Sequence, residues 1–351
     1  MKMMFYVATL HGGGAERVMV NLANEFSEKK NDVYLVTDYI FDDEYEIQKD
    51  VKRQILKNYN GKSRIAKNLV QICSLRKLIK NIRPNVIISF LPENNIRAHF
   101  ANININVKHV VSLRNSPKKV FSSSASGKLV QYVFKKADTI IVQTDDAKRW
   151  IEQNLHRKAN IIMNQVDESF FKIKRNEKNN IIAVGKFLPQ KNHALLIHAF
   201  SIIADQINEN LIIYGEGKLR EKYQSLIHEL NMDSRIFLPG FSDNMQEIYA
   251  ECKLFVLSSD YEGMPNVLLE AMAAGTPCIS TNCPCGGPKM IIKDGINGCL
   301  VECNDSLALA ETILFCLKND EIRKKMGENA SKTAQAFKPD TIFKTWEKIL
   351  E

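Results

Sequence analysis

One stretch near residue 265 joins two strand-like segments through a short helix. The first segment, Leu254–Leu257, is apolar, and the second, Cys278–Thr281, follows about twenty residues later. Between them, four apolar residues recur at the spacing of one buried helix face: Val267, Leu268, Ala271 and Met272. Strand, loop, helix and strand in this order predict half of a parallel α/β layer.

The two ends of this helix carry residues that helices prefer there. Pro265 has no N–H and therefore suits the first helical turn, with Asn266 or the residues just before it as the cap. Gly275 follows the last apolar position, where a left-handed cap is expected, and Pro277 stops the helix from continuing. The helix is thus expected to begin near Pro265, directly after the loop that follows the first strand.

Two glutamates flank the start of the helix. Glu262 lies in the loop at the carboxyl end of the first strand, and Glu270 lies eight residues later inside the helix. Open α/β sheets bind ligands at such strand ends, and the N–H groups of Met264–Val267 favour a phosphate there. We expect the two carboxylates to bind sugar hydroxyls beside that phosphate. Spacing alone leaves an alternative, in which Glu262 is a cap and Glu270 is solvated.

The sequence EGMPNVLLEAMAAGTPCIST, which starts at Glu262, resembles the Glu-x7-Glu region of family 4 glycosyltransferases. These are retaining, metal-independent enzymes with the GT-B fold, in which two Rossmann-like parallel-sheet domains face a cleft. The resemblance implies that Glu262 approaches the donor sugar and that Glu270 holds the nucleotide ribose. It also places Gly263, Pro265 and the Ala-Gly-x-Pro ending where the family has them, and it implies no cofactor. With the helix-start argument above, Met264, Pro265, Asn266 and Val267 are expected at the donor diphosphate.

Two lysines follow another predicted strand, Ile181–Val184, which lies earlier in the chain. Lys186 and Lys191 at this strand end would neutralise a diphosphate and stabilise it as a leaving group, although two solvated lysines are the alternative. Family members usually have Gly-Arg-Leu-x-x-x-Lys-Asn here, so Lys186 keeps the charge of the arginine but loses its bidentate fork. Phe241, after the predicted strand Ile236–Leu238, would border the nucleotide base. The alternative, which is equally compatible with the sequence, is that Phe241 lies in the core.

A glycine-rich loop follows the first predicted strand, Met3–Leu10, and opens a helix. It is neither a Rossmann fingerprint nor a P-loop. The letters GGGAER resemble the first loop of family 4 enzymes that act on polysaccharide and glycan precursors. The resemblance implies that Gly13 and Gly14 lie near the donor phosphates and the acceptor, and that Glu16 and Arg17 contact the acceptor.

Arg114 and Asn115 follow the predicted strand His109–Leu113. Many relatives carry a histidine near this place, and this chain has the Arg-Asn variant instead. No catalytic histidine is therefore assigned. Because polar residues at strand ends fall on the ligand side of the sheet, Arg114 and Asn115 are candidates for acceptor or sugar contacts.

Basic residues are concentrated in one part of the chain. Between Asp50 and Asp138 there are eighteen lysines and arginines, and Glu93 is the only acidic residue. The positive electrostatic field of so many basic residues attracts anions. We expect this part of the chain to bind a membrane surface or a polyprenyl diphosphate. A solvated face balanced by acidic residues elsewhere is the alternative.

The length of 351 residues predicts two domains. We predict a first, acceptor-binding domain at 1–170, a linker at 171–180 and a second, nucleotide-sugar-binding domain at 181–338. A final helix at 340–351 is expected to complete the first domain, as in GT-B proteins. The polar run Asn164–Asn180 is the best linker candidate.

No apolar run reaches the ~18 residues of a transmembrane helix, and no signal peptide is recognised. We therefore expect a cytoplasmic protein that is peripheral at the cytoplasmic face of the membrane. The spacings of Cys283-Pro284-Cys285 and of Cys299 with Cys303 do not match a zinc knuckle, so no metal site is predicted. The role of Cys283 and Cys285 stays open.

The resemblance implies a retaining hexosyltransferase, and with the strand-end residues it gives Glu262, Lys186 and Lys191 as the expected catalytic residues. The expected donor is a UDP-linked hexose or N-acetylhexosamine, and the expected acceptor is a lipid-linked or other saccharide for capsule, O-antigen or protein glycosylation. A sugar-nucleotide 2-epimerase with a related fold is the alternative. A dehydrogenase would need a dinucleotide fingerprint, and a nucleic-acid-binding protein would need aromatic residues among the basic ones or a known module.

Overall fold

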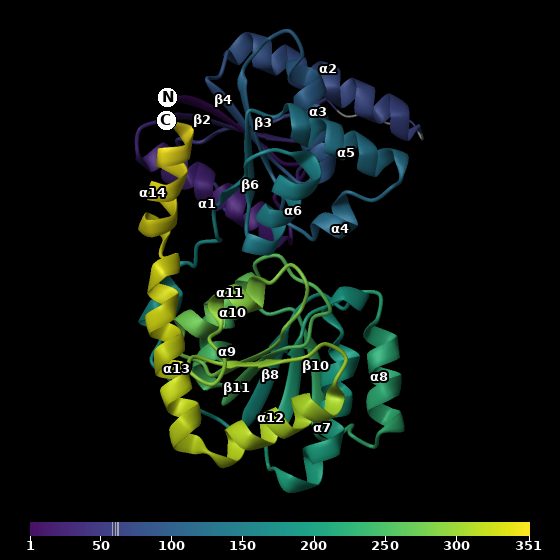
Figure 1. The fold of residues 1–351 in the computed structure, drawn as a ribbon, viewed down its shortest axis with the longest axis vertical. Helices are drawn as coiled ribbons and strands as arrows, with labels where there is room; N and C mark the ends of the chain where they lie inside the picture. Colours follow the sequence, from purple (N-terminus) through teal and green to yellow (C-terminus); the bar gives the residue numbers. More distant parts are fainter. Residues whose placement is uncertain (58, 60, 62) are drawn as a thin grey trace. The chain divides into compact units, whose positions relative to one another are not determined.

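The computed structural model describes residues 1–57, 59, 61 and 63–351 (Figure 1). Lys62, one of the basic residues between Asp50 and Asp138, lies outside the described residues. Contacts divide the chain into two units: residues 1–163 with 345–351, and residues 164–344. The predicted linker 171–180 falls in the second unit, where Arg175 donates hydrogen bonds to the carbonyls of Tyr249 and Cys252.

In the described part of the chain, the first unit contains one sheet of seven strands in the order β3-β2-β1-β4-β5-β6-β7. The strands are β1 Lys2–Tyr6, β2 Asp32–Thr37, β3 Lys52–Ile55, β4 Val86–Phe90, β5 Lys108–Ser112, β6 Thr139–Val142 and β7 Asn160–Ile161. They pair in parallel, so their carboxyl ends share one edge. The strand order reverses between β1 and β4, which makes this edge the ligand side of the unit.

Helices cover both faces of this sheet. The helices of the unit are α1 Gly14–Glu28, α2 Arg64–Ile82, α3 Pro92–Asn102, α4 Pro117–Val120, α5 Ala125–Lys136 and α6 Asp145–Leu155. Met4 and Tyr6 of β1 point to the face that α2 and α3 cover, where they share a core with Leu75. Phe5 points to the opposite face and packs against Phe26 of α1, with 6.0 Å between the ring centroids.

The second unit is built on a parallel sheet with the order β10-β9-β8-β11-β12-β13. Its strands are β8 Asn180–Val184, β9 Asn210–Tyr214, β10 Ile236–Gly240, β11 Leu254–Leu257, β12 Cys278–Thr281 and β13 Cys299–Val301. Its helices are α7 His193–Ile203, α8 Arg220–Glu229, α9 Met245–Glu251, α10 Asn266–Ala273, α11 Gly287–Ile291, α12 Ser306–Lys318 and α13 Asp320–Ala334. The order reverses between β8 and β11, so the loops after these two strands meet at the ligand edge.

The strand, loop, helix and strand around residue 265 form as predicted, with one difference. Pro265 is the extended residue before the helix, with φ −76° and ψ 108°, and α10 begins at Asn266. Pro265 is therefore the cap and not part of the first helical turn. Gly275 ends the helix in the left-handed region with φ +72°, as expected.

The last helix, α14 Pro339–Leu350, begins in the second unit, and its final residues belong to the first. In the first unit, Trp346 packs against Phe90 with 6.2 Å between the ring centroids, and Lys108 Nζ donates to the carbonyl of Leu350 at 2.8 Å. None of the helices formed by the described residues is both long and apolar enough to cross a bilayer.

Candidate functional site

Glu262 lies in the loop after β11, and three side chains hold its carboxylate. Its Oε1 lies 2.5 Å from Lys191 Nζ and accepts a hydrogen bond from Ser259 Oγ at 2.7 Å. Its Oε2 lies 3.4 Å from Gln190 Nε2. Glu262 is only 6% exposed, and no side chain in the described part of the protein caps α10. The alternative of a capping Glu262 is therefore wrong.

The loops after β8 and β11 are tied together, and this brings Lys191 to Glu262. The N–H of Asp260 donates to the carbonyl of Gln190 at 2.8 Å, and Ser258 Oγ donates to the carbonyl of Lys191 at 3.0 Å. Asn192 Nδ2 donates to Asp260 Oδ1 at 2.7 Å. Because β8 and β11 are neighbours where the strand order reverses, residues far apart in sequence form one site at the ligand edge.

A third loop, after β12, closes against the same place. The N–H of Glu262 donates to the carbonyl of Pro284 at 3.2 Å. A Cβ atom at Gly287 would lie 1.6 Å from the carbonyl oxygen of Gly263, which no side chain can tolerate. Glycine at position 287 is therefore required for the close approach of the two loops, and the sequence alone did not single it out.

Glu270 lies in the second turn of α10 and is only 4% exposed. The hydroxyl of Tyr249 in α9 lies 3.1 Å from the carbonyl of Val267 and 3.4 Å from Glu270 Oε2. The alternative of a solvated Glu270 is wrong. Its carboxylate is held in place by a neighbouring helix, as expected of a group that binds a ligand in one orientation.

The start of α10 is also held from a distant part of the chain. The buried Asn164 donates from Nδ2 to the carbonyl of Met264 at 3.1 Å and to Asn266 Oδ1 at 2.6 Å. The first backbone bonds of the helix come from the N–H groups of Leu268 and Leu269 to the carbonyl of Pro265. The N–H groups of Met264, Asn266 and Val267 precede these bonds, at the positive end of the helix dipole.

Two predicted donor residues lie at the surface of the second unit. Lys186 is exposed, and its side chain makes no hydrogen bond or ion pair with any described residue, whereas Lys191 is paired with Glu262. Phe241 is 68% exposed, so its alternative of a core position is wrong. Both residues follow strands at the ligand edge, Lys186 after β8 and Phe241 after β10.

In the first unit, the glycine-rich loop leads into α1. Gly13 is the cap of the helix, Gly14 is its first residue, and Glu16 lies in its first turn. A Cβ atom at Gly13 would lie 1.9 Å from Glu16 Oε2, so the missing side chain leaves room for that carboxylate. The N–H of Arg17 donates to the carbonyl of Gly13 at 3.0 Å. The loop thus brings these four predicted residues together after β1.

Arg114 and Asn115 lie at the carboxyl end of β5, also at the ligand edge. The guanidinium of Arg114 lies 3.9 Å from the centre of the Phe90 ring. Burial lowers the pKa of Arg114 to about 9. Asn115 is exposed, and its Oδ1 accepts a hydrogen bond from the N–H of Ser116 at 2.7 Å. The stacked Arg114 is a rigid cationic group beside the strand ends.

A buried charged cluster that the sequence pattern did not predict lies at the same edge. Asp38, just after β2, accepts hydrogen bonds from the Tyr6 hydroxyl at 2.9 Å and from Arg97 Nη1 at 2.6 Å. Burial raises the pKa of Asp38, while Arg97 opposes the shift. The sequence did offer a signal for this cluster, since Asp38 is a polar residue directly after β2 and Arg97 is one within α3. Ser259 and Gln190, beside Glu262, were missed in the same way.

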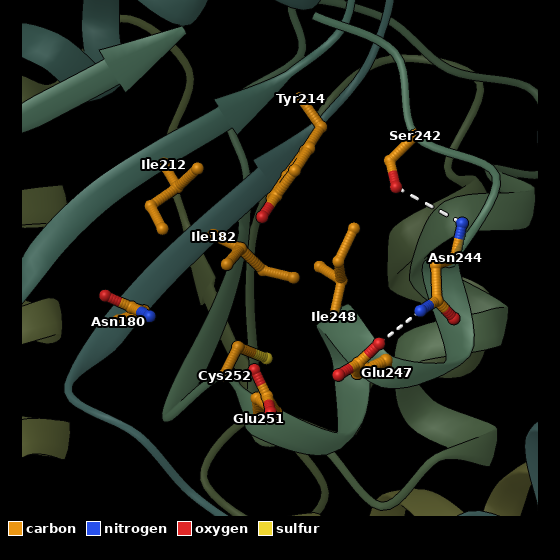
Figure 2. A pocket seen from close by; sticks show the side chains of 10 residues that line it. All are labelled: Asn180, Ile182, Ile212, Tyr214, Ser242, Asn244, Glu247, Ile248, Glu251 and Cys252. Carbon is orange, nitrogen blue, oxygen red and sulfur yellow. Dashed lines mark hydrogen bonds between the residues drawn. The ribbon is translucent and has the colours of Figure 1, made fainter. Parts of the chain in front are cut away.

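The second unit also contains a cavity of about 240 Å³ away from these residues. It lies between β8, β9 and α9, and Figure 2 shows Ile182, Ile212 and Tyr214 along one side and Asn244 and Glu247 along the other. None of the predicted donor residues lines it. Among the described residues, no three His, Cys, Asp or Glu side chains gather as metal ligands, and Cys283 and Cys285 are free thiols.

Family models match nearly the whole chain. The model described as Glycosyltransferase Family 4 matches residues 12–170, and the model described as Glycosyl transferases group 1 matches residues 165–333. A Methanocaldococcus jannaschii protein named uncharacterized glycosyltransferase MJ1178 is 30% identical over 70% of this chain and 67% of its own length.

A Campylobacter jejuni protein is 27% identical over 100% of this chain and 98% of its own length. Its name describes an alpha-1,4-N-acetyl-D-galactosaminyltransferase that acts on a saccharide linked to PP-undecaprenol.

Two solved structures share the fold over the full length. Sucrose-phosphate synthase from Thermosynechococcus elongatus has a TM-score of 0.85 and 17% identity, covering 99% of this chain and 97% of its own. The Anabaena protein Alr3699/HepE, solved with UDP and glucose, has a TM-score of 0.84 and 18% identity, covering 100% of this chain and 99% of its own. On this evidence the chain belongs to the family 4 glycosyltransferases and has their GT-B fold.

Proposed function

We propose that the protein is a retaining glycosyltransferase that moves a hexose or N-acetylhexosamine from a UDP-sugar to a lipid-linked or other saccharide acceptor. The observation that carries the proposal is the contact of Glu262 with both Lys191 and Ser259 beside the start of α10. A buried carboxylate, a lysine and a helix N-terminus at one strand edge suit a sugar joined to a diphosphate.

Each residue of the second unit has a role in this proposal. The diphosphate is stabilised as it leaves by Lys191, Lys186 and the N–H groups of Met264, Asn266 and Val267. Glu262 orients the donor sugar, Glu270 binds the ribose, and the exposed Phe241 borders the base. The buried positions of both glutamates support these roles, because a carboxylate held by neighbours binds hydroxyl groups in a fixed direction.

The reaction needs no covalent intermediate on the protein. The bond between the anomeric carbon and the diphosphate oxygen breaks, and the acceptor hydroxyl oxygen bonds to the same carbon from the same face. The proton of that hydroxyl passes to the departing diphosphate, which leaves as UDP. Positive charge from Lys191 and Lys186 stabilises the transition state, where negative charge grows on the diphosphate.

The names of relatives support the choice of donor and acceptor. The Anabaena neighbour was solved with UDP-glucose, and the Campylobacter relative is named for transfer of N-acetylgalactosamine to a PP-undecaprenol-linked saccharide. We therefore propose a UDP-sugar donor and a polyprenyl-diphosphate-linked acceptor. Capsule, O-antigen and protein glycosylation are the pathways in which such a product would be used.

In this proposal the first unit binds the acceptor through Glu16, Arg17, Arg114 and Asn115, with Gly13 and Gly14 near the donor phosphates. The protein works at the cytoplasmic face of the membrane, where its acceptor is anchored. The excess of basic residues between Asp50 and Asp138 supports this location, since the acceptor diphosphate and the lipid headgroups are anions.

The test begins with nucleotide binding. Thermal unfolding with UDP, GDP and ADP, and then with a panel of UDP-sugars, is expected to show the largest stabilisation with a UDP-sugar. Transfer of the stabilising sugar to a polyprenyl-diphosphate saccharide should then give a product with the donor's anomeric configuration. Failure of every nucleoside diphosphate to bind would contradict the proposal, and isomerisation of the donor without acceptor would indicate an epimerase.

A further inference from the structure

Helices α2, α3 and α5 lie side by side on one face of the first sheet (Figure 1). Leu75 and Ile79 of α2 and Ala98 of α3 share a core with β1 and β4, and Val133 of α5 packs on the same face through Val111 of β5. The outer surface of this layer, here called the α2–α3–α5 face, is not covered by any other described element of the first unit.

Large apolar side chains point outward from this face. Ile65 and Leu69, one turn apart on α2, are 75% and 58% exposed. Leu129 and Tyr132 of α5 and Ile103 at the end of α3 are also exposed. Scattered apolar residues are common on protein surfaces, but this layer exposes five large ones, and Ile65, Leu69 and Leu129 all lie near the starts of their helices. This concentration indicates a binding surface.

The same face is strongly basic. Five exposed lysines on α2 and α5 form no ion pair with a described residue: Lys77, Lys80, Lys128, Lys135 and Lys136. The single acidic residue of this part of the chain, Glu93, pairs with Arg64 at the surface. Exposed aliphatic and aromatic side chains among unpaired lysines suit a surface that is anionic outside and apolar beneath.

We propose that the α2–α3–α5 face binds the anionic surface of a lipid bilayer. In this arrangement Ile65, Leu69 and Leu129 enter the boundary between headgroups and acyl chains, while the lysines contact the headgroup phosphates. Nucleic acid is also anionic, but a phosphate backbone offers no place for exposed leucine and isoleucine. The apolar residues therefore favour a membrane.

The position of the apolar residues connects this surface to acceptor binding. A helix that follows a parallel strand runs back along it, so the N-terminal ends of α2 and α5 lie toward the ligand edge of the sheet. Ile65 and Leu69 lie in the first two turns of α2, and Leu129 lies near the start of α5. A lipid-anchored acceptor would thus reach the edge that carries Arg114 while its chain stays in the bilayer; this step rests on the proposed function.

The experiment is sedimentation of the full chain with vesicles of phosphatidylcholine, with or without phosphatidylglycerol. The protein is expected to bind only the anionic vesicles, and added salt should release it. In the Lys77→Glu/Lys80→Glu variant, the affinity for anionic vesicles should fall by about thirtyfold or more. The Ile65→Ser/Leu69→Ser variant should bind about tenfold less. None of these residues belongs to the proposed catalytic site.

Matched controls come from the second unit. Leu307 is 57% exposed, like Leu69, so Ile202→Ser/Leu307→Ser tests the loss of apolar surface elsewhere and should leave vesicle binding unchanged. Lys318→Glu/Lys325→Glu tests the reversal of two exposed charges in the second unit and should also leave vesicle binding unchanged. Equal binding to both vesicle types, or vesicle binding unaffected by the α2 variants, would overturn the proposal. The proposal would also be overturned if a single-stranded oligonucleotide released the protein from the vesicles only when the α2 lysines are intact.

A second readout separates this proposal from the proposed function. With a soluble acceptor that lacks the polyprenyl chain, the α2 variants should turn over as fast as the unaltered protein. With an acceptor embedded in anionic vesicles, they should be slower by the factor seen in binding. Suppose instead that the unaltered protein and every variant are inactive on both acceptors, while the unaltered protein binds anionic vesicles and the α2 variants do not. That result would count against the glycosyl transfer and leave the membrane surface standing.

Discussion

The Ser259 hydroxyl donates a hydrogen bond at 2.7 Å to the same Glu262 oxygen that Lys191 contacts at 2.5 Å. Thr281 Oγ1 donates to the carbonyl of Ser259 at 2.5 Å, so the serine is itself fixed by β12. In the proposed reaction a diphosphate would draw Lys191 away, and Ser259 and Gln190 would still hold the carboxylate. We therefore propose that Ser259 is a positioning residue for Glu262.

Substitution of Ser259 by alanine is therefore expected to lower kcat while UDP affinity stays close to normal. The lost hydrogen bond to a charged group and the looser carboxylate correspond to about 2 kcal/mol, or roughly thirtyfold in kcat. Ser280→Ala is the matched control, because Ser280 is equally buried but, among the residues that the structure describes, its hydroxyl bonds only to the neighbouring carbonyl of Thr281. A kcat loss of the same size in both variants would show that Ser259 acts only through general stability.

Lys191 and Lys186 are expected to differ in importance although both are predicted catalytic residues. Lys191→Ala removes the charge next to the diphosphate and leaves the buried Glu262 without its cation, so transfer should fall by about 10³-fold. Lys186 is exposed and free to move, and Lys186→Ala should cost about tenfold. Steady-state kinetics with saturating donor measures both, with Lys318→Ala as an exposed control. Equal losses for the two lysines would contradict the assigned roles.

Much of this site follows from strand order, which the sequence pattern indicates well. The β11–α10–β12 segment, the Gly275 cap and the lysine loop after β8 were all predicted from apolar periodicity and helix-end residues. The strands β3 and β13 were missed. The four residues of β3, Lys-Arg-Gln-Ile, are mostly polar because it is an edge strand, and such a segment has no apolar alternation to detect.

Side-chain partners were harder to predict than positions. Nothing in the spacing of Ser259 and Glu262 distinguishes a hydrogen-bonded pair from two loop residues. Gly287 became important only because its loop meets Gly263, more than twenty residues earlier, at a distance that excludes a Cβ atom. Contacts of this kind depend on how loops from neighbouring strands pack, and local sequence does not encode that packing.

Glu270→Gln is expected to weaken UDP binding by about tenfold to a hundredfold, because a charged acceptor for the ribose hydroxyls becomes a neutral amide of the same shape. Glutamine also keeps the buried volume, so the fold should persist. Tyr249→Phe removes only the hydroxyl near Glu270 Oε2 and should have a smaller effect on affinity. Calorimetric titration with UDP measures both. Unchanged UDP affinity in Glu270→Gln would rule out the ribose contact.

Gly287→Ala is expected to abolish transfer and to destabilise the second unit. The added methyl group would overlap the Gly263 carbonyl oxygen, so the loop after β12 must move and the Glu262 N–H must lose its bond to Pro284. Overpacking of this kind costs about 1–3 kcal/mol. Gly295→Ala is an informative comparison, since no atom of the described residues lies within 4 Å of its Cβ position. It therefore tests backbone strain alone at φ +72°. Thermal unfolding and transfer rates would be compared. Normal activity in Gly287→Ala would show that the close loop contact is dispensable.

Two buried histidines predict how stability depends on pH. Burial lowers the pKa of His109 to about 3 and that of His193 to about 4. In the unfolded chain both have a pKa of about 6.5, so below that pH the unfolded state binds more protons than the folded state. The free energy of unfolding must therefore fall as the pH drops from about 6.5 toward the folded pKa values. Between about pH 7 and about pH 5 each histidine should account for about 2 kcal/mol of this loss.

The variant His109→Gln should lose less stability on acidification than the unaltered protein, by about that amount. Urea unfolding of both proteins at the two pH values measures the difference. His198→Gln is the control, because His198 is exposed, and its pH dependence should match that of the unaltered protein. An identical loss of stability in His109→Gln and in the unaltered protein would mean that His109 is already protonated, or still solvated, in the folded state.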